Sequence, residues 1–288
     1  MNLLCDSGLS TEIVCEHNLE GHWQDFPLLI VPELYTEPKA DLIADLQSYA
    51  ENGGSLLIIG ARAARLLAPH FGFTVAPSSE FLVNPAFVNL DNGHNLTALE
   101  SADPCYFSLD GNRFGSMIGA YTVNKEDAVT YGKIYGDTRD TGIPVAQVFS
   151  RGKGKVGVIG TDMGVQYYNG MQYLHRELVT KMADAMFTPL AHIDECIGMV
   201  EMVCLEKDGK FMLQLVNTNG HHTNNRVFTE DTIPPVVDLQ VSILADKPVE
   251  KLILQPEGRN LAFTLEDGRY RFTVDRLDLH NIVEVQYK

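Results

Sequence analysis

Positively charged side chains are scarce in this chain of 288 residues. Lys and Arg number 22 against 38 Asp and Glu, which leaves a formal net charge of -16, and no basic run exceeds a couple of residues. Nucleic acids and anionic membrane surfaces both require a cationic footprint on the protein that binds them. The composition therefore argues against nucleic acid or membrane as the main partner.

Cysteine is also sparse, and long apolar runs are missing. No apolar run approaches the roughly 18 residues needed to cross a membrane, and the N-terminal stretch lacks the pattern of a signal peptide. We therefore expect a cytoplasmic protein. The cysteines lack Cys-x-x-Cys spacing, so small buried side chains are a simpler interpretation than disulfides or a metal site. They are Cys5, Cys15, Cys105, Cys196 and Cys204.

Motifs for cofactors and metals are absent or out of place. Gly152–Gly157 matches G-x-G-x-x-G, but a dinucleotide loop follows a strand and opens a helix, whereas this one precedes the apolar run 156–159. It is better interpreted as a tight hairpin turn. None of the nine histidines has the paired i, i+4 spacing with a glutamate of a zinc helix. We expect no cofactor and no metal.

The first part of the chain, from about residue 26 to 187, alternates apolar runs with helical patterns. Its continuous apolar runs are typical of parallel strands that are buried on both faces. We therefore predict an α/β domain at 1–190 with a doubly wound, flavodoxin-like sheet. Strands are predicted at 26–32, 55–59 and 155–159, and helices at 39–52, 61–70 and 169–187.

Beyond Pro189 the apolar period changes to two. Alternating runs flank the turn pairs Asp208-Gly209 and Asp267-Gly268, which are strong hairpin signals, and further alternating runs cover 237–243 and 280–285. Several short alternating strands separated by turns indicate a small antiparallel β-sandwich. We place this second domain at 191–288.

The stretch Gly53–Leu67, GGSLLIIGARAARLL, has the pattern of a strand, a sharp turn and a helix. Many α/β enzymes place a nucleophile at such an elbow, because the bend exposes one side chain above the sheet. Here the apex is Ala61, whose methyl group has no nucleophilic chemistry. The pattern predicts an elbow without a nucleophile, and leaves the adjacent Arg62 as a candidate for ligand contact.

A second candidate follows the strand predicted at 155–159. Asp162, Tyr167 and Tyr168 come after this strand, at the carboxyl edge where open α/β sheets bind ligands. They are candidates to contact a sugar or a neighbouring domain. The alternative is a capped helix start that simply packs on the sheet.

Seven segments of the chain carry a resemblance to a known arrangement. Those of the first domain are FPLLIVPE (26–33), YAENGG (49–54), SLLIIG (55–60) and GKGKVGVIGTDMG (152–164), and those of the second are LVNT (215–218), IPPVVD (233–238) and LHNIV (279–283). Together they resemble the trimerisation domain of barrel-type β-galactosidases and the small C-terminal β-domain that follows it. The trimerisation domain has the class I glutamine amidotransferase-like fold, and the resemblance covers nearly the whole chain.

The resemblance implies an elbow that has lost its nucleophile. Active class I amidotransferases carry a cysteine there and a later His-Pro-Glu, whereas this chain has Gly60-Ala61-Arg62 and no His-Pro-Glu. In the family, glycoside hydrolysis belongs to an upstream (β/α)₈ barrel that supplies the two carboxylates. We therefore expect no catalytic residue and no activity in this chain alone, which would be the accessory and oligomerisation portion of a glycoside hydrolase.

Two other functions stay open. One is a stand-alone carbohydrate-binding or regulatory protein that uses the loops at the carboxyl edge of the sheet. The other is an enzyme with Asp162 as its base, for which the sequence offers no partner residue.

The resemblance also implies partners. A domain used for trimerisation exposes an apolar face, so we expect a homo-oligomer, with a trimer as one possibility, and an upstream barrel domain. Residues 1–8 are interpreted as the end of a first helix and Thr11–Cys15 as a second strand. The central strand is then expected to lie N-terminal to Met1, in a reading frame that continues into the barrel.

Overall fold

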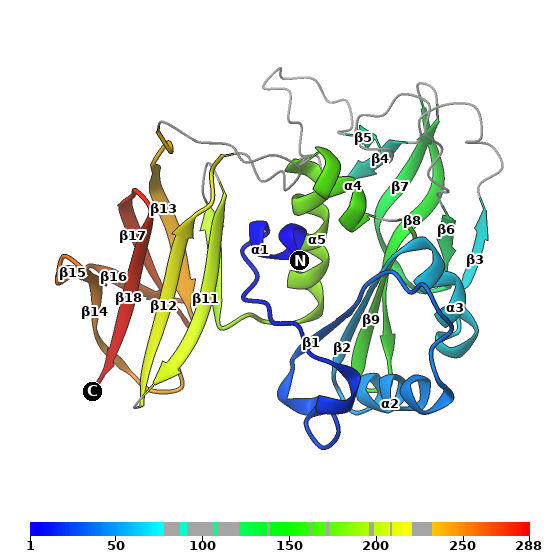
Figure 1. Cartoon of the computed structure of the whole chain (residues 1–288), viewed down its shortest axis with the longest axis horizontal. Coiled ribbons are helices and arrows are strands. Elements are labelled where there is room, and N and C mark those ends of the chain that lie inside the picture. Colours follow the sequence, from blue (N-terminus) through cyan, green and yellow to red (C-terminus); the bar gives the residue numbers. More distant parts are fainter. Residues whose placement is uncertain are drawn as a thin grey trace. The chain divides into compact units, whose positions relative to one another are not determined.

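The chain forms two compact units in a computed structural model (Figure 1). One, the α/β unit, spans Ile13–Thr188, and the other, the β unit, combines Met1–Glu12 with Pro189–Lys288. The α/β domain predicted at 1–190 included the first twelve residues, because a short helical pattern does not reveal which hydrophobic core the helix joins. The structure describes residues 1–77, 87–90, 106–108, 121–136, 139–161, 163–170, 173–195, 199–207, 209–220 and 232–288.

The α/β unit contains a mixed parallel and antiparallel sheet together with a few helices. Its elements are η1 (Glu16–Asn18), η2 (Trp23–Asp25), β1 (Leu28–Val31), α2 (Ala40–Glu51), β2 (Ser55–Ile59), α3 (Ala61–Phe71), β3 (Thr74–Pro77), β4 (Phe87–Leu90), β5 (Tyr106–Ser108), β6 (Tyr121–Asn124), β7 (Val129–Gly136), β8 (Arg139–Arg151), β9 (Gly154–Ile159), α4 (Met163–Gly170) and α5 (Tyr173–Met186). The strand order is β1-β2-β9-β8-β7-β4-β5, and β3 pairs separately with β6. Only β1, β2 and β9 run parallel to one another, while the other neighbours are antiparallel.

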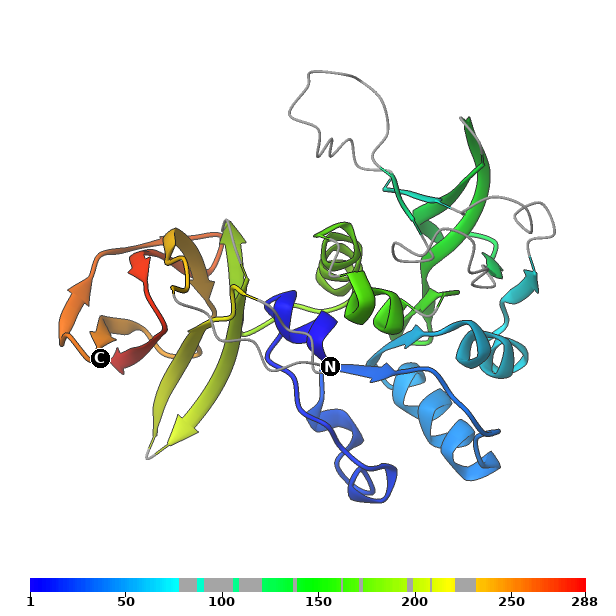
Figure 2. The same ribbon diagram turned by 45° about the horizontal axis from the view of Figure 1, so that its top comes forward.

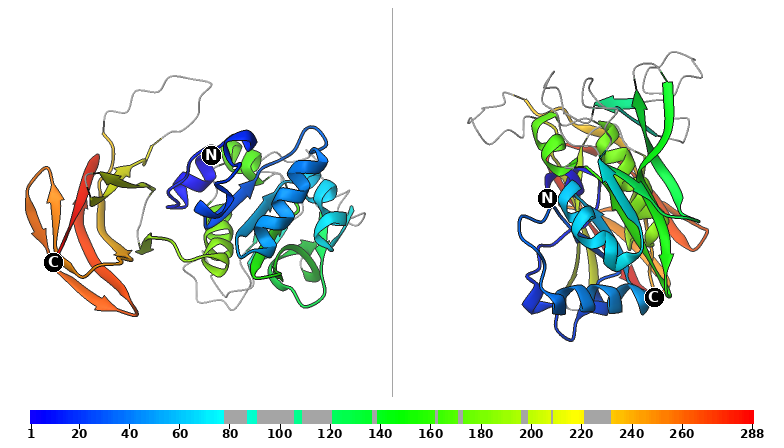
Figure 3. Two further views of the ribbon diagram at one scale, coloured as in Figure 1. Left: turned by 90° about the horizontal axis from the view of Figure 1, so that it is seen from below. Right: turned by 90° about the vertical axis from the view of Figure 1, so that its right-hand side faces the viewer.

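Helices cover both faces of the parallel strands (Figure 2, Figure 3). Leu56 and Ile58 of β2 are buried in a core shared with side chains of α2 and α3. Leu57 points to the opposite face, since successive strand residues alternate. On that face Gly157 of β9 leaves room for Leu57 and for Met186 of α5. This two-sided cover explains the continuous apolar run predicted as a strand at 55–59.

β1 is the edge strand of this sheet. Among the described strands it pairs only with β2, and its four residues are half-buried, whereas those of β2 are all buried. The strand predicted at Thr11–Cys15 is wrong, because these residues adopt no strand and the sheet ends at β1. The helix predicted at 169–187 corresponds to two helices, α4 and α5, and α4 begins earlier, at Met163.

The β unit consists of two antiparallel sheets. They have the orders β10-β13-β17-β16 and β11-β12-β18-β14-β15. The elements are α1 (Asn2–Asp6), β10 (Ala191–Glu195), β11 (Val200–Lys207), β12 (Lys210–Asn217), β13 (Val236–Ile243), β14 (Val249–Gln255), β15 (Arg259–Leu261), β16 (Phe263–Glu266), β17 (Arg269–Leu277) and β18 (His280–Tyr287). The hairpins predicted around 208–209 and 267–268 are confirmed as β11–β12 and β16–β17.

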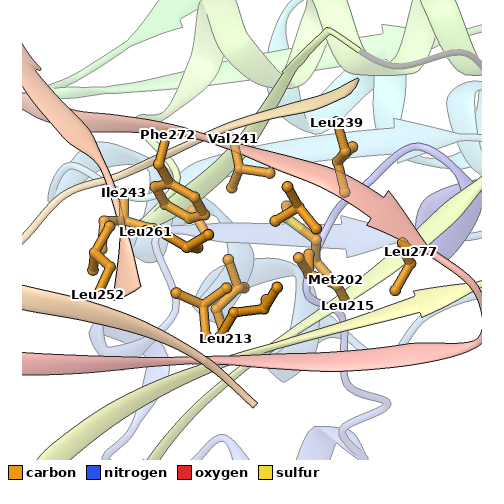
Figure 4. Close-up of a cluster of buried hydrophobic side chains, with 14 of the residues drawn as sticks. Met202, Leu213, Leu215, Leu239, Val241, Ile243, Leu252, Leu261, Phe272 and Leu277 are labelled. Atoms are coloured by element: carbon orange, nitrogen blue, oxygen red, sulfur yellow. The ribbon is translucent and has the colours of Figure 1, made fainter. Parts of the chain in front are cut away.

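One hydrophobic core joins the two sheets of the β unit. Leu239 and Val241 from one sheet and Leu213 and Leu215 from the other are fully buried in a single cluster (Figure 4). The alternating apolar residues of each strand therefore face a shared interior, as the period of two requires.

Candidate functional site

The elbow predicted at Gly60-Ala61-Arg62 lies between β2 and α3. β2 ends at Ile59 and α3 begins at Ala61, so the turn consists of Gly60 alone. Ala61 is buried, with 8% of its surface exposed, and offers only a methyl group. The elbow geometry is present, and the residue at its apex has no group that could attack a substrate.

The start of α3 is occupied by a carboxylate from another strand. Glu33, two residues beyond β1, accepts the backbone N–H of Ala63 at Oε1 (2.8 Å) and that of Arg62 at Oε2 (3.1 Å). Oε1 also accepts the N–H of Leu34 (3.0 Å). The first N–H groups of a helix have no partner within the helix and carry the positive end of its dipole. Glu33 therefore caps α3, since Gly60 has no side chain to do so.

Gly60 is required by this contact. Its φ is 146°, and a Cβ there would lie 2.9 Å from the Cα, Cδ and Oε2 atoms of Glu33. The sequence pattern predicts the elbow but not the role of Glu33, which lies 29 residues before Arg62. The available signal was an acidic residue directly after a parallel strand, beside a helix start that lacks its own cap.

The other candidate residues do not gather into one site in the described residues. Arg62 has an exposed side chain at the elbow, and Tyr168 is half-buried in α4. Tyr167 is fully buried, with its ring edge-on to that of His175 at a centroid distance of 6.3 Å. This burial corresponds to the packing alternative that the sequence left open for Tyr167. Asp162 lies outside the described residues.

His175 on α5 is a buried titratable group of this region. None of its surface is exposed, and burial lowers its pKa from 6.5 to about 4, because the charged imidazolium loses its hydration. The ring is therefore neutral at pH 7. Its contact with Tyr167 places it in the interior rather than in an accessible site.

The G-x-G-x-x-G segment forms a hairpin turn, as its position before a strand predicted, and this turn is closely packed. It forms the turn between β8 and β9, where a Cβ on Gly154 would lie 2.0 Å from the carbonyl oxygen of Gly54. A Cβ on Gly152 would lie 2.6 Å from the Cα of Glu51. These glycines let the turn approach the loop between α2 and β2. Their backbone positions are used for packing.

A polar cluster lies on the β10-β13-β17 sheet. Asp194 accepts hydrogen bonds from the Ser242 hydroxyl (2.8 Å) and pairs with His192 Nδ1 (2.9 Å) and with Arg271. Ser242 in turn accepts a hydrogen bond from Nε of Arg269 (2.9 Å). Because Ser242 bonds to the carboxylate rather than to the imidazole, the cluster is not arranged as a catalytic triad.

The described part of the chain contains no group of three or more His, Cys, Asp or Glu side chains that could hold a metal ion. None of its helices is long and apolar enough to cross a membrane.

Several solved structures of glycoside hydrolases contain a region whose fold is similar to that of this chain. No protein-family model and no curated protein sequence matches it. Alpha-L-fucosidase isoenzyme 2 from Paenibacillus thiaminolyticus matches all of the chain at a TM-score of 0.72 and 17% identity. The β-galactosidase from Bacillus circulans sp. alkalophilus matches 99% at 0.54 and 13%, and that from Rahnella sp. R3 matches 98% at 0.52 and 14%.

The chain corresponds to less than half of each of these proteins. It covers 44% of the fucosidase and 36% and 35% of the two β-galactosidases. At these identities the likeness is one of fold. The chain therefore has the fold of a region found within glycoside hydrolases, and both of its units take part in the match.

Proposed function

We propose that this chain is a non-catalytic accessory and oligomerisation portion of a glycoside hydrolase, whose catalytic barrel lies outside it. The observation that carries the proposal is that the match to the fucosidase includes the whole chain but only 44% of the enzyme. On this proposal, the α/β unit is a flavodoxin-like domain related to class I amidotransferases. The two sheets of the β unit are the sandwich that follows it.

The chemistry of the elbow supports a role without catalysis. Glycosidases use a pair of carboxyl groups about 5 to 9.5 Å apart on either side of the scissile bond. At the elbow, Glu33 contributes a carboxylate, and this carboxylate accepts hydrogen bonds from the backbone N–H groups of Arg62 and Ala63. A carboxylate held in this way caps a helix instead of facing a substrate.

The proposed partners are the barrel and further copies of the chain. The barrel supplies the hydrolytic carboxylates, and the accessory portion contributes to assembly and to the shape of the active site. We expect light scattering on the purified chain to report an oligomer at micromolar concentration. A clean monomer would count against self-association of the isolated chain.

Activity assays test the non-catalytic role. We expect the purified chain to release no nitrophenol from nitrophenyl α-L-fucoside or β-D-galactoside, the two classes suggested by the names of its structural neighbours. Turnover that follows the chain through two unrelated columns would overturn the proposal. The alternative, a carbohydrate-binding protein, predicts that a sugar raises the melting temperature and that Tyr168→Ala abolishes the effect.

A further inference from the structure

We propose that Glu33 is an internal ligand of the elbow. Its carboxylate takes the position at which the start of α3 would receive an external anion, and the same contact fastens the edge strand β1 to that helix. This goes beyond the accessory role, since it concerns whether the elbow can bind any ligand at all.

The carboxylate satisfies donors that an anion would otherwise use. A helix start with free N–H groups is a ready binding position for phosphate or carboxylate. At α3 the N–H groups of Arg62 and Ala63 point at the two oxygens of Glu33, at 3.1 and 2.8 Å. Hydrogen bonds to an ionised acceptor are stronger than neutral ones. A dissolved anion would have to displace a tethered one, which is already at high effective concentration.

The backbone around the elbow is shaped to this contact. A side chain at position 60 would collide with Glu33, because its Cβ would lie 2.9 Å from both the backbone and the carboxylate of that residue. The two backbone segments, at Glu33 and at position 60, can therefore approach this closely only with glycine at position 60. The contact thus depends on two residues, Glu33 and Gly60, which lie far apart in the sequence.

The contact also secures a weakly held strand. Of the strands that the structure describes, β2 alone is a neighbour of β1, and residues Leu28–Val31 are half-buried. Glu33 follows this strand by two residues and joins its end to α3 across the elbow. Loss of the carboxylate would therefore loosen the end of β1 as well as the first turn of the helix.

Chemical rescue tests the proposal. The variants are Glu33→Ala and Glu33→Gln, with Glu37→Ala, an exposed glutamate of the same unit, as the matched control. Trp23 is the single tryptophan and belongs to this unit, so its fluorescence follows the relevant unfolding. We expect Glu33→Ala to lower the melting temperature by about 4–8 °C, the upper end of the range for losing a helix cap in a domain of this size.

Sodium formate then supplies a free carboxylate. We expect it to raise the melting temperature of Glu33→Ala by several degrees more than sodium chloride at equal ionic strength, and to leave the native protein unchanged. The melting temperature of Glu33→Gln, which keeps one acceptor oxygen, should lie between those of Glu33→Ala and the native protein. If Glu33→Ala does not fold, Glu33→Gln decides the question through hydrogen exchange: faster exchange at Arg62 and Ala63 supports the proposal, and unchanged exchange overturns it.

Three results would overturn it. A melting temperature for Glu33→Ala equal to that of Glu37→Ala would show that the carboxylate contributes nothing. Equal stabilisation of the native protein and the variant by formate would show that Glu33 does not fill the position. Unchanged hydrogen exchange at Leu29 and Val31 in a destabilised variant would show that Glu33 does not fasten β1 to α3.

Discussion

Replacement of Asn217 by alanine should destabilise the β unit more than any surface change. Asn217 ends β12 and is 6% exposed, so its amide is largely withdrawn from water. Its Nδ2 donates to the carbonyl oxygens of Pro234 and Asp278, both at 2.8 Å, and its Oδ1 accepts the N–H of Asn219 at 3.0 Å. The side chain thereby ties the end of β12 to the entry of β13 and to the turn between β17 and β18.

The magnitude follows from these three contacts. Each partner that loses a hydrogen bond in a partly buried site costs about 1 kcal/mol, and somewhat more where water cannot replace the amide. We expect Asn217→Ala to lower the free energy of unfolding by about 2–4 kcal/mol. The matched control is Asn260→Ala on the exposed strand β15, which should change it by less than about 0.5 kcal/mol.

The assay has to report on the β unit. Tryptophan fluorescence is unsuitable, because Trp23 belongs to the α/β unit. Hydrogen exchange of peptides from β12, β13 and β18 measures the stability of the affected strands directly. Equal exchange in Asn217→Ala and Asn260→Ala would refute the reasoning, since it would mean that the three contacts contribute no net stability.

Two further predictions concern the α/β unit and can be followed by tryptophan fluorescence during urea unfolding. Gly154→Ala should lower the free energy of unfolding by about 3 kcal/mol, because its Cβ would lie 2.0 Å from the carbonyl oxygen of Gly54. Gly164→Ala, with open space around it, should be neutral or slightly stabilising. Equal stabilities of the two variants would contradict the packing argument. The pKa of His175 is lowered to about 4, so the unfolded chain binds a proton between about pH 6.5 and 4 that the folded chain does not. The contribution of His175 to the free energy of unfolding should therefore be constant above about pH 6.5 and fall by up to about 3 kcal/mol toward pH 4. His175→Gln should weaken the pH dependence of stability between about pH 6.5 and 4, and an unchanged pH dependence in this variant would contradict the role of His175.

Local sequence patterns located most of the elements close to the site. The strand predicted at 55–59 is confirmed as β2, and the helix predicted at 61–70 as α3, which ends one residue later. Apolar periodicity and a glycine break depend on residues that are near one another in the chain, so they can be read without knowing the fold. The absence of a nucleophile at Ala61 is equally visible, because it follows from the identity of one residue.

Strand direction and neighbours were harder to predict. The apolar run at 26–32 looks like an interior strand, yet β1 lies at an edge, and the run at 11–15 finds no strand to pair with. A strand is stabilised by hydrogen bonds to its neighbours, and these neighbours are distant in sequence. The sequence of β1 therefore indicated that a strand would form but not which position it would take.

The sequence by itself determined that the elbow has no catalytic side chain, that the first part of the chain alternates helices with strands and that the second is built from hairpins. Only the tertiary structure decided what the elbow does contain. The contact of Glu33 with Arg62 spans 29 residues, and the approach of Gly154 to Gly54 spans 100. Both depend on how the parallel strands bring their ends and loops together in space. No local propensity encodes that proximity, because burial and hydrogen bonding across a sheet arise only once the chain has packed.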